Sequence, residues 1–153
     1  MKLKFLGKMK MQTIFQSIKE HPYELNMVKE IALAACSGMS PNGLVARVSV
    51  SDLAIDDKHA LSICMGSVSA DDEGFKSIAT EFPVFAVNGC EGNCVGKILR
   101  DKGIDVIGEI NVGDTLEPTG HRANDVARLD DEGELCVSIL KEAIEEKLSE
   151  LRD

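Results

Sequence analysis

The sequence predicts an α/β fold, a three-layer, Rossmann-like sandwich around a mainly parallel sheet of four or five strands. Short apolar runs alternate along the chain with segments of helical spacing, which is typical of parallel strands joined by crossover helices. The chain has 153 residues, of which 44% are hydrophobic, enough for one domain with a single core. We therefore expect residues 31–153 to form a single α/β domain.

Four apolar runs supply the expected strands. The first, 31–36, is continuously apolar and ends at Ser37 and Gly38, as expected of a strand buried on both faces. The others are 60–65, which stops at Gly66; 83–87, which runs into Asn88; and 104–110.

Segments of helical character separate these runs and close the chain. We expect helices near 42–55, over 71–80, between 93 and 103, and over 135–151. The first and last show apolar residues at helical spacing, and the second has acidic residues in its first turn. Asn93 as an N-cap and Gly103 at the C-terminal capping position bound the third.

Residues 1–30 show no clear period, so we expect an N-terminal extension that is either flexible or a docked helix. The first ten residues carry four lysines without the apolar stretch and cleavage site of a secretory signal. No apolar run is long enough to span a membrane. We therefore expect a cytoplasmic protein with no membrane contact. The net charge of −9 makes nucleic acid an unexpected partner, and the sequence names no protein partner.

The five cysteines are the most informative residues. A reducing compartment disfavours disulfides, so metal ligands or reactive thiols are expected. Four cysteines end an expected strand or open the following helix: Cys36, Cys64, Cys90 and Cys94. Because the carboxyl ends of parallel strands meet at one edge of a sheet, we expect these four thiols to converge. Cys136 lies within the closing helix and is expected to be structural.

Four thiolates around one point form the tetrahedral site that zinc prefers. A helix N-terminus lowers the pKa of a nearby thiol, which favours thiolates at Cys90 and Cys94. Lys97 and Arg47 are candidates to offset part of the negative charge. The favoured function is thus zinc binding in a structural or metal-handling role.

Plainer explanations apply to some of these residues. Cysteine is common in protein cores, so Cys36 and Cys64 at apolar strand ends also fit a packing role. His59 and His121 are candidate nitrogen ligands, although single loop histidines are more often solvated.

Three blocks of the sequence resemble the DGC family, a group of small proteins described as zinc-binding. The blocks are Ala35-Cys36-Ser37-Gly38-Met39-Ser40, Cys64-Met65-Gly66 and the run from Val87 to Leu99, within about residues 31–112. The resemblance implies an α/β fold with a zinc site formed by Cys36, Cys64, Cys90 and Cys94, and it implies no reaction. Asn88 stands where the family motif has Asp, so the resemblance assigns that position no carboxylate here.

Other chemistries stay open, and so does the question whether the protein is an enzyme. Cys90 and Cys94 also suit thiol redox chemistry or persulfide transfer. Four thiolates can hold an iron–sulfur cluster in place of zinc, and zinc is favoured. A cysteine phosphatase needs C-x5-R, and the sixth residue after Cys36 is Asn42, so that activity is not expected.

Overall fold

The computed structural model describes residues 29–153, and the expected N-terminal extension over 1–30 lies almost entirely outside them. The elements in chain order are β1 (Ile31–Ala35), α2 (Pro41–Asp56), β2 (Ala60–Ile63), α3 (Met65–Ser69), α4 (Glu73–Glu81), β3 (Val84–Asn88), α5 (Cys94–Asp101), β4 (Val106–Asn111), α6 (Val112–Leu116), the 3-10 helix η1 (Glu117–Thr119) and α7 (Asp131–Arg152). Within the described range no helix has both the length and the apolar character needed to cross a membrane.

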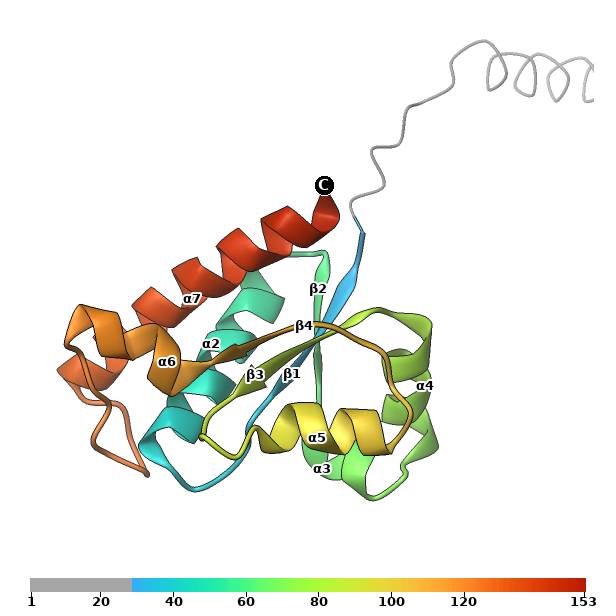
Figure 1. The fold of residues 1–153 in the computed structure, drawn as a ribbon, viewed down its shortest axis with the longest axis horizontal. Coiled ribbons are helices and arrows are strands. Elements are labelled where there is room, and N and C mark those ends of the chain that lie inside the picture. Colours follow the sequence, from blue (N-terminus) through green and yellow to red (C-terminus); the bar gives the residue numbers. More distant parts are fainter. Residues whose placement is uncertain (1–28) are drawn as a thin grey trace, which may run out of the picture.

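The strands form one sheet in the order β2-β1-β3-β4, and every pairing is parallel. Helices α2 and α7 pack together on one face of the sheet, while α5, with α3 and α4, covers the other (Figure 1). This confirms the predicted three-layer, Rossmann-like α/β architecture.

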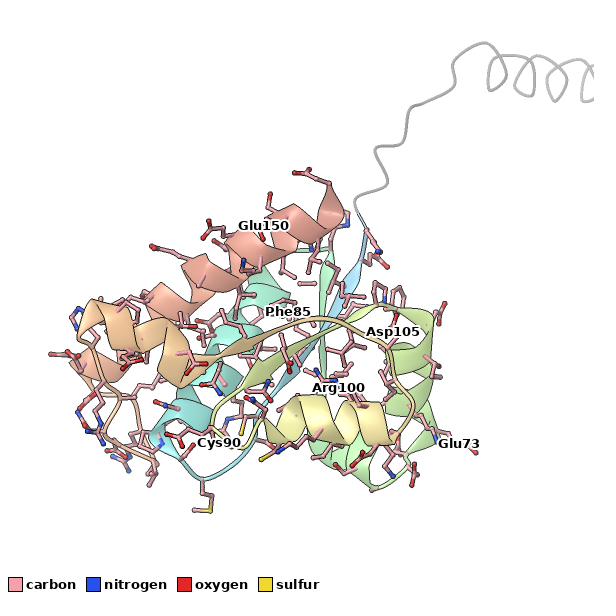
Figure 2. The ribbon with its side chains drawn as sticks, viewed as in Figure 1. Glu73, Phe85, Cys90, Arg100, Asp105 and Glu150 are labelled. Atoms are coloured by element: carbon pink, nitrogen blue, oxygen red, sulfur yellow. The ribbon has the colours of Figure 1, made fainter. Side chains whose placement is uncertain are left out.

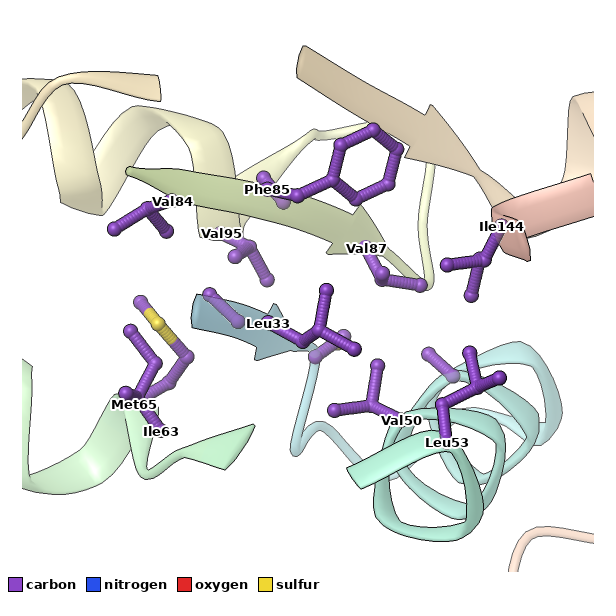
Figure 3. Packing of buried hydrophobic residues seen from close by; sticks show 14 of the residues in the cluster. Leu33, Val50, Leu53, Ile63, Met65, Val84, Phe85, Val87, Val95 and Ile144 are labelled. Carbon is purple, nitrogen blue, oxygen red and sulfur yellow. The ribbon is translucent and has the colours of Figure 1, made fainter. Parts of the chain in front are cut away.

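The core lies on both faces of the two central strands, β1 and β3, whose residues are almost all buried. Figure 3 shows Met65 and Val95 packed on one side of the sheet and Val50 and Leu53 on the other, around Leu33 of β1. Helices on both faces explain why these strands appear in the sequence as continuous apolar runs rather than as alternating patterns.

The second strand is shorter than predicted. It ends at Ile63, because Cys64 is the N-cap of α3 and Gly66 lies inside that helix. A helix of five residues has too little periodicity to be predicted, and α6, directly after β4, was missed for the same reason.

The four predicted helices correspond to α2, α4, α5 and α7. Helix α7 begins earlier than its apolar stripe, at Asp131, because the Asp130 carboxylate accepts the N–H of Gly133 (2.8 Å) and caps it. Gly103, with φ of +71°, ends α5 as predicted. Asn93 occupies the N-cap position of α5, but its side chain makes no capping hydrogen bond.

Strand β1 lies between β2 and β3. The chain therefore passes from β1 to a neighbour on one side, β2, and then crosses to β3 on the other side. Such a switch point opens a crevice at the carboxyl ends of the strands, where α/β proteins bind ligands. The loops that follow β1 and β3 border this crevice.

Candidate metal centre

All four predicted ligands lie at the carboxyl edge of the sheet. Cys36 follows β1, and its N–H still pairs with the carbonyl of Val87 in β3 (2.9 Å). Cys64 follows β2 as the N-cap of α3. Cys90 lies in the loop after β3, and Cys94 is the first residue of α5. Figure 2 shows Cys90 near the starts of α2 and α5.

Cys90 and Cys94 form a thiol pair. Their Sγ atoms are 3.4 Å apart, and a Cβ added to Gly92, between them, would lie 3.5 Å from each sulfur. The hydrogen bond with Cys94 holds the pKa of the Cys90 thiol below its ordinary value, with help from N–H groups of the loop. The same contact raises the pKa of Cys94. The pair therefore favours a thiolate at Cys90, as expected, and a thiol at Cys94, so the expectation of a lowered pKa was wrong for Cys94.

Cys36 opens onto the same space as this pair. It is buried, and its Sγ accepts the N–H of Gly38 (3.4 Å). With Cys90 and Cys94 it lines a cavity of about 440 Å³. The other lining residues are Ser37, Gly38, Met39, Ser40, Met65, Val95 and Ile98. Three of the four predicted ligands thus share one mostly apolar cavity.

Cys64 stands apart from these three. It is exposed and does not line the cavity, although the next residue, Met65, does. The N–H and hydroxyl of Ser67, and then the N–H of Gly66, lower the pKa of the Cys64 thiol. The first turn of α3, rather than another cysteine, stabilises this thiolate.

The sulfur positions match part of a zinc coordination shell. Among the side chains of residues 29–153, no three of His, Cys, Asp or Glu are gathered closely enough to hold a metal ion. With Zn–S bonds of about 2.3 Å, neighbouring sulfurs of a zinc tetrathiolate are about 3.8 Å apart. The Cys90–Cys94 spacing of 3.4 Å is close to one edge of that tetrahedron. The donor set therefore suits zinc, and a complete shell requires Cys36 and Cys64 to approach the pair.

The loop after β3 meets the first turn of α2 backbone to backbone at the site. A Cβ added to Gly89 would lie 2.7 Å from the Cα atom of Gly43, and one added to Gly43 would lie 2.7 Å from the carbonyl oxygen of Gly38. Side chains do not fit at these distances, so glycine is required at positions 43 and 89. The loop that carries Cys90 thus packs against the first turn of α2, and that turn packs against Gly38 in the loop that carries Cys36.

Asn111, which the sequence analysis missed, holds the loop between Cys90 and Cys94 from the end of β4. Its Nδ2 donates to the carbonyl of Cys90 (2.8 Å) and to Oδ1 of Asn93 (2.9 Å). Asn93 has φ of +49°, so this contact supports a left-handed turn. The signal was available, because Asn111 follows an expected strand at the same edge as the cysteines.

Asn88 connects the end of β3 to both α5 and β4. It is 1% exposed; its Oδ1 accepts the N–H of Gly96 (3.2 Å), and its Nδ2 donates to Oε2 of Glu109 (3.3 Å). Glu109 also pairs with Arg100 (2.7 Å), which lies on the side of α5 that faces β4 (Figure 2). Because both polar atoms of its amide are bonded within the protein, Asn88 supports the site and is not a ligand.

A second cavity, of about 430 Å³, adjoins the first. It lies between the start of α2, the loop after β3 and residues beyond η1, and its lining comprises Ser40, Pro41, Asn42, Gly89, Cys90, Glu91, Gly92, Arg122 and Ala123. Opposite charges, from Glu91 and Arg122, make this cavity more polar than the first. Cys90 lines both cavities.

The remaining candidates lie away from the thiol cavity. Cys136 is fully buried in α7, and burial raises the pKa of its thiol, which fits a structural residue. His59 precedes β2 at the opposite edge of the sheet, and Nδ1 of His121 is paired with a glutamate 2.9 Å away. Neither Lys97 nor Arg47 is among the residues that line the thiol cavity.

The fold and the site together define a parallel α/β domain with cysteines along the carboxyl edge of its sheet. A family model described as the DGC domain matches residues 32–131. The chain therefore belongs to the DGC domain family. Comparisons with curated proteins and with solved structures found no match.

Proposed function

We propose that this DGC domain binds a metal ion, zinc, through cysteine thiolates at the carboxyl edge of the sheet, in a structural or metal-handling role. The ligands are Cys36, Cys90, Cys94 and, from the start of α3, Cys64. The proposal rests on one observation: Cys36 from the loop after β1, Cys90 from the loop after β3 and Cys94 from the start of α5 open onto one cavity.

The surroundings of the sulfurs suit thiolates. Backbone N–H groups of the loop donate to the Cys90 sulfur, and Sγ of Cys36 accepts the N–H of Gly38. These donors disperse the negative charge that a zinc thiolate site adds to a chain of net charge −9. If Cys64 stays at the N-cap of α3, three thiolates leave the fourth position open, which is typical of catalytic zinc and also suits a transferable ion.

Metal analysis of the purified, untagged chain tests the proposal. We expect about one zinc per chain and the loss of most of it in Cys90→Ser. Cys136→Ser removes a thiol from α7, outside the cavity, and should retain zinc. The sulfur-to-cobalt charge-transfer band of the Co(II) form reports how many thiolates bind, so Cys64→Ser distinguishes three ligands from four. A wild-type chain that takes up neither zinc nor Co(II) would overturn the proposal.

A second candidate function is dithiol–disulfide exchange by Cys90 and Cys94. It is favoured by their 3.4 Å contact and opposite pKa shifts, the pattern of an attacking thiolate beside a resolving thiol. The Cys90 thiolate would attack an external disulfide RSSR, form a mixed disulfide and release RS⁻. After losing its proton, Cys94 would attack the mixed disulfide, release the second RS⁻ and close a Cys90–Cys94 disulfide.

Mass spectrometry after treatment with oxidised glutathione tests this exchange. The wild type should lose two hydrogen masses without a lasting adduct, whereas Cys94→Ser should retain one glutathione on Cys90. A wild-type chain that keeps both thiols reduced contradicts the exchange.

The same thiols can also serve iron–sulfur or persulfide chemistry, and simple observations separate these alternatives from zinc. An iron–sulfur cluster would colour protein prepared without oxygen, whereas a zinc protein is colourless. Persulfide transfer would leave one added sulfur atom on the metal-free chain, at Cys94, and mass spectrometry would detect it.

A further inference from the structure

We propose that the cavity beside Cys90 and Cys94 also binds trivalent arsenicals that carry one apolar substituent, with both sulfurs bonded to arsenic. This inference rests on the proposed function in one respect, because it needs the same two thiols to be free and accessible. The spacing of the thiols, the size and lining of the cavity, and the charge of the product support it.

The spacing suits a centre that bonds only two sulfurs. The Sγ atoms are 3.4 Å apart, less than the edge of about 3.8 Å in a zinc tetrathiolate. Trivalent arsenic is pyramidal, with bond angles narrower than tetrahedral, so it holds two sulfurs closer together. In the described part of the chain no third His, Cys, Asp or Glu completes a metal-holding group with the pair, and arsenic with one carbon substituent requires none.

The cavity has far more room than a single ion occupies. Its volume of about 440 Å³ is in the range of small-molecule pockets. The wall beyond the sulfurs includes Met39, Met65, Val95 and Ile98, which offer apolar and polarisable surface. Figure 3 shows Met65 and Val95 on the same side of the sheet. A phenyl or alkyl group on the arsenic atom would be buried against this wall.

The charge of the product also suits the cavity. An arsine oxide, R–As=O, reacts with two thiols: two As–S bonds form, the As=O and both S–H bonds break, and the oxygen leaves as water. Arsenic remains trivalent, so no oxidant or reductant is needed, and the product is neutral. No Lys, Arg, His, Asp or Glu is among the lining residues, so a neutral product leaves no uncompensated charge there.

Two arsenicals that bond the same pair of thiols test the role of the cavity. Each compound, phenylarsine oxide or methylarsine oxide, is bound to the reduced, metal-free full chain, and dithiothreitol is then added as a competitor. Because dithiothreitol is itself a dithiol, the intrinsic affinity of each arsenical for dithiols cancels in the comparison. We expect the chain to retain the phenyl compound about tenfold more strongly than the methyl compound, because more apolar surface is buried. Thiol titration should show the loss of the Cys90 and Cys94 thiols with either compound.

Variants separate the cavity wall from the sulfurs. Ile98→Ser should reduce the preference for phenyl by about threefold or more while the affinity for the methyl compound, which reports an intact pair, is kept. Met39→Ser changes an exposed part of the wall and repeats the test at a position where folding is not at stake. Ile55→Ser is the matched control, because Ile55 lies on α2 with 81% exposure, and it should leave the preference unchanged. Cys94→Ser should abolish tight binding of both compounds.

Equal retention of the two arsenicals by the wild type, or an unchanged preference in both wall variants, overturns the inference. Co(II) uptake by the same preparations distinguishes this failure from failure of the proposed function. A chain that binds Co(II) but shows no phenyl preference refutes only the arsenical site. A chain that binds neither Co(II) nor arsenicals refutes both proposals.

Discussion

At the scale of single residues, the amide of Asn88 performs two tasks that a carboxylate cannot combine. It accepts the N–H of Gly96 and donates to the carboxylate of Glu109. An Asp at position 88, the residue of the family motif, would keep the first contact but turn an oxygen toward Glu109 with no proton between them. Asn88 and Glu109 therefore work as a matched pair that holds the start of α5, where Cys94 lies.

Asn88→Asp should lower the free energy of unfolding by about 1–3 kcal/mol, the usual cost of a buried polar group that loses its partner. The double variant Asn88→Asp with Glu109→Gln should recover most of this loss, because the new amide can donate to the new carboxylate. Urea unfolding of both variants, with Glu109→Gln as the control, measures the recovery. If the double variant is no more stable than Asn88→Asp, the pairing argument is wrong.

At the scale of elements, α5 is anchored at both ends. Asn88 binds its N-terminal turn through Gly96, and after its C-terminus Lys102 pairs with Asp71 (2.6 Å), in the turn between α3 and α4. Because α5 begins with Cys94, these anchors also fix the position of one half of the thiol pair.

The anchor at Asp71 should give a pH-dependent contribution to stability. Hydrogen bonds from Lys102 and then Lys76 hold the pKa of the Asp71 carboxyl below its ordinary value. A carboxyl group whose pKa is lowered in the folded state stabilises the fold at pH values above the ordinary carboxyl pKa. This contribution is lost as the pH falls through the lowered pKa. Asp71→Asn should thus lower the Tm at neutral pH and have no effect in strong acid. Asn tolerates the positive φ of this position (+59°) as Asp does.

Thermal unfolding of Asp71→Asn and the wild type across this pH range checks the prediction. Asp105→Asn is the control, since it removes an exposed carboxylate in the loop before β4 (Figure 2). A Tm difference that persists unchanged in strong acid would exclude the ion pair as its source.

The contact between the loop after β3 and the first turn of α2 should be intolerant of side chains. A Cβ at Gly89 would approach the Cα atom of Gly43 to 2.7 Å, so Gly89→Ala should destabilise the fold by about 1–3 kcal/mol and weaken metal binding. Gly66→Ala is the matched control, because its Cβ would meet only Sγ of Cys64, at 3.7 Å. Denaturant unfolding of both variants measures the effect on stability, and Co(II) titration of Gly89→Ala against the wild type measures the effect on metal binding. Equal stability of the two variants would count against the close contact between Gly89 and Gly43.

At the scale of the whole molecule, the sheet and the edge that carries the cysteines could be predicted, because strands buried on both faces leave continuous apolar runs. The distances between sulfurs could not. Cys64 ends such a run, but the chain turns there into a helix too short to show a period, and this separates its thiol from the other three. The approach of Cys90 to Cys94 depends on a turn at Gly92 and on Asn111, whose position at this edge could be predicted but whose hydrogen bonds to the loop could not.

Zinc binding should stabilise the entire domain, because ligands that bind only the folded state shift unfolding by mass action. At about one hundred times the Kd the gain is about 2.7 kcal/mol, which corresponds to a rise in Tm of about 5–10 °C. A chelator should reverse it. Calorimetry should find the rise in Cys136→Ser and not in Cys90→Ser; an equal rise in both would place the bound metal elsewhere.

Cys90 borders both the apolar cavity that it shares with Cys36 and Cys94 and the polar cavity with Arg122. A group attached to its sulfur can extend into one of these spaces but not into both. Two molecules that each need this sulfur, one held in each cavity, would therefore compete for it.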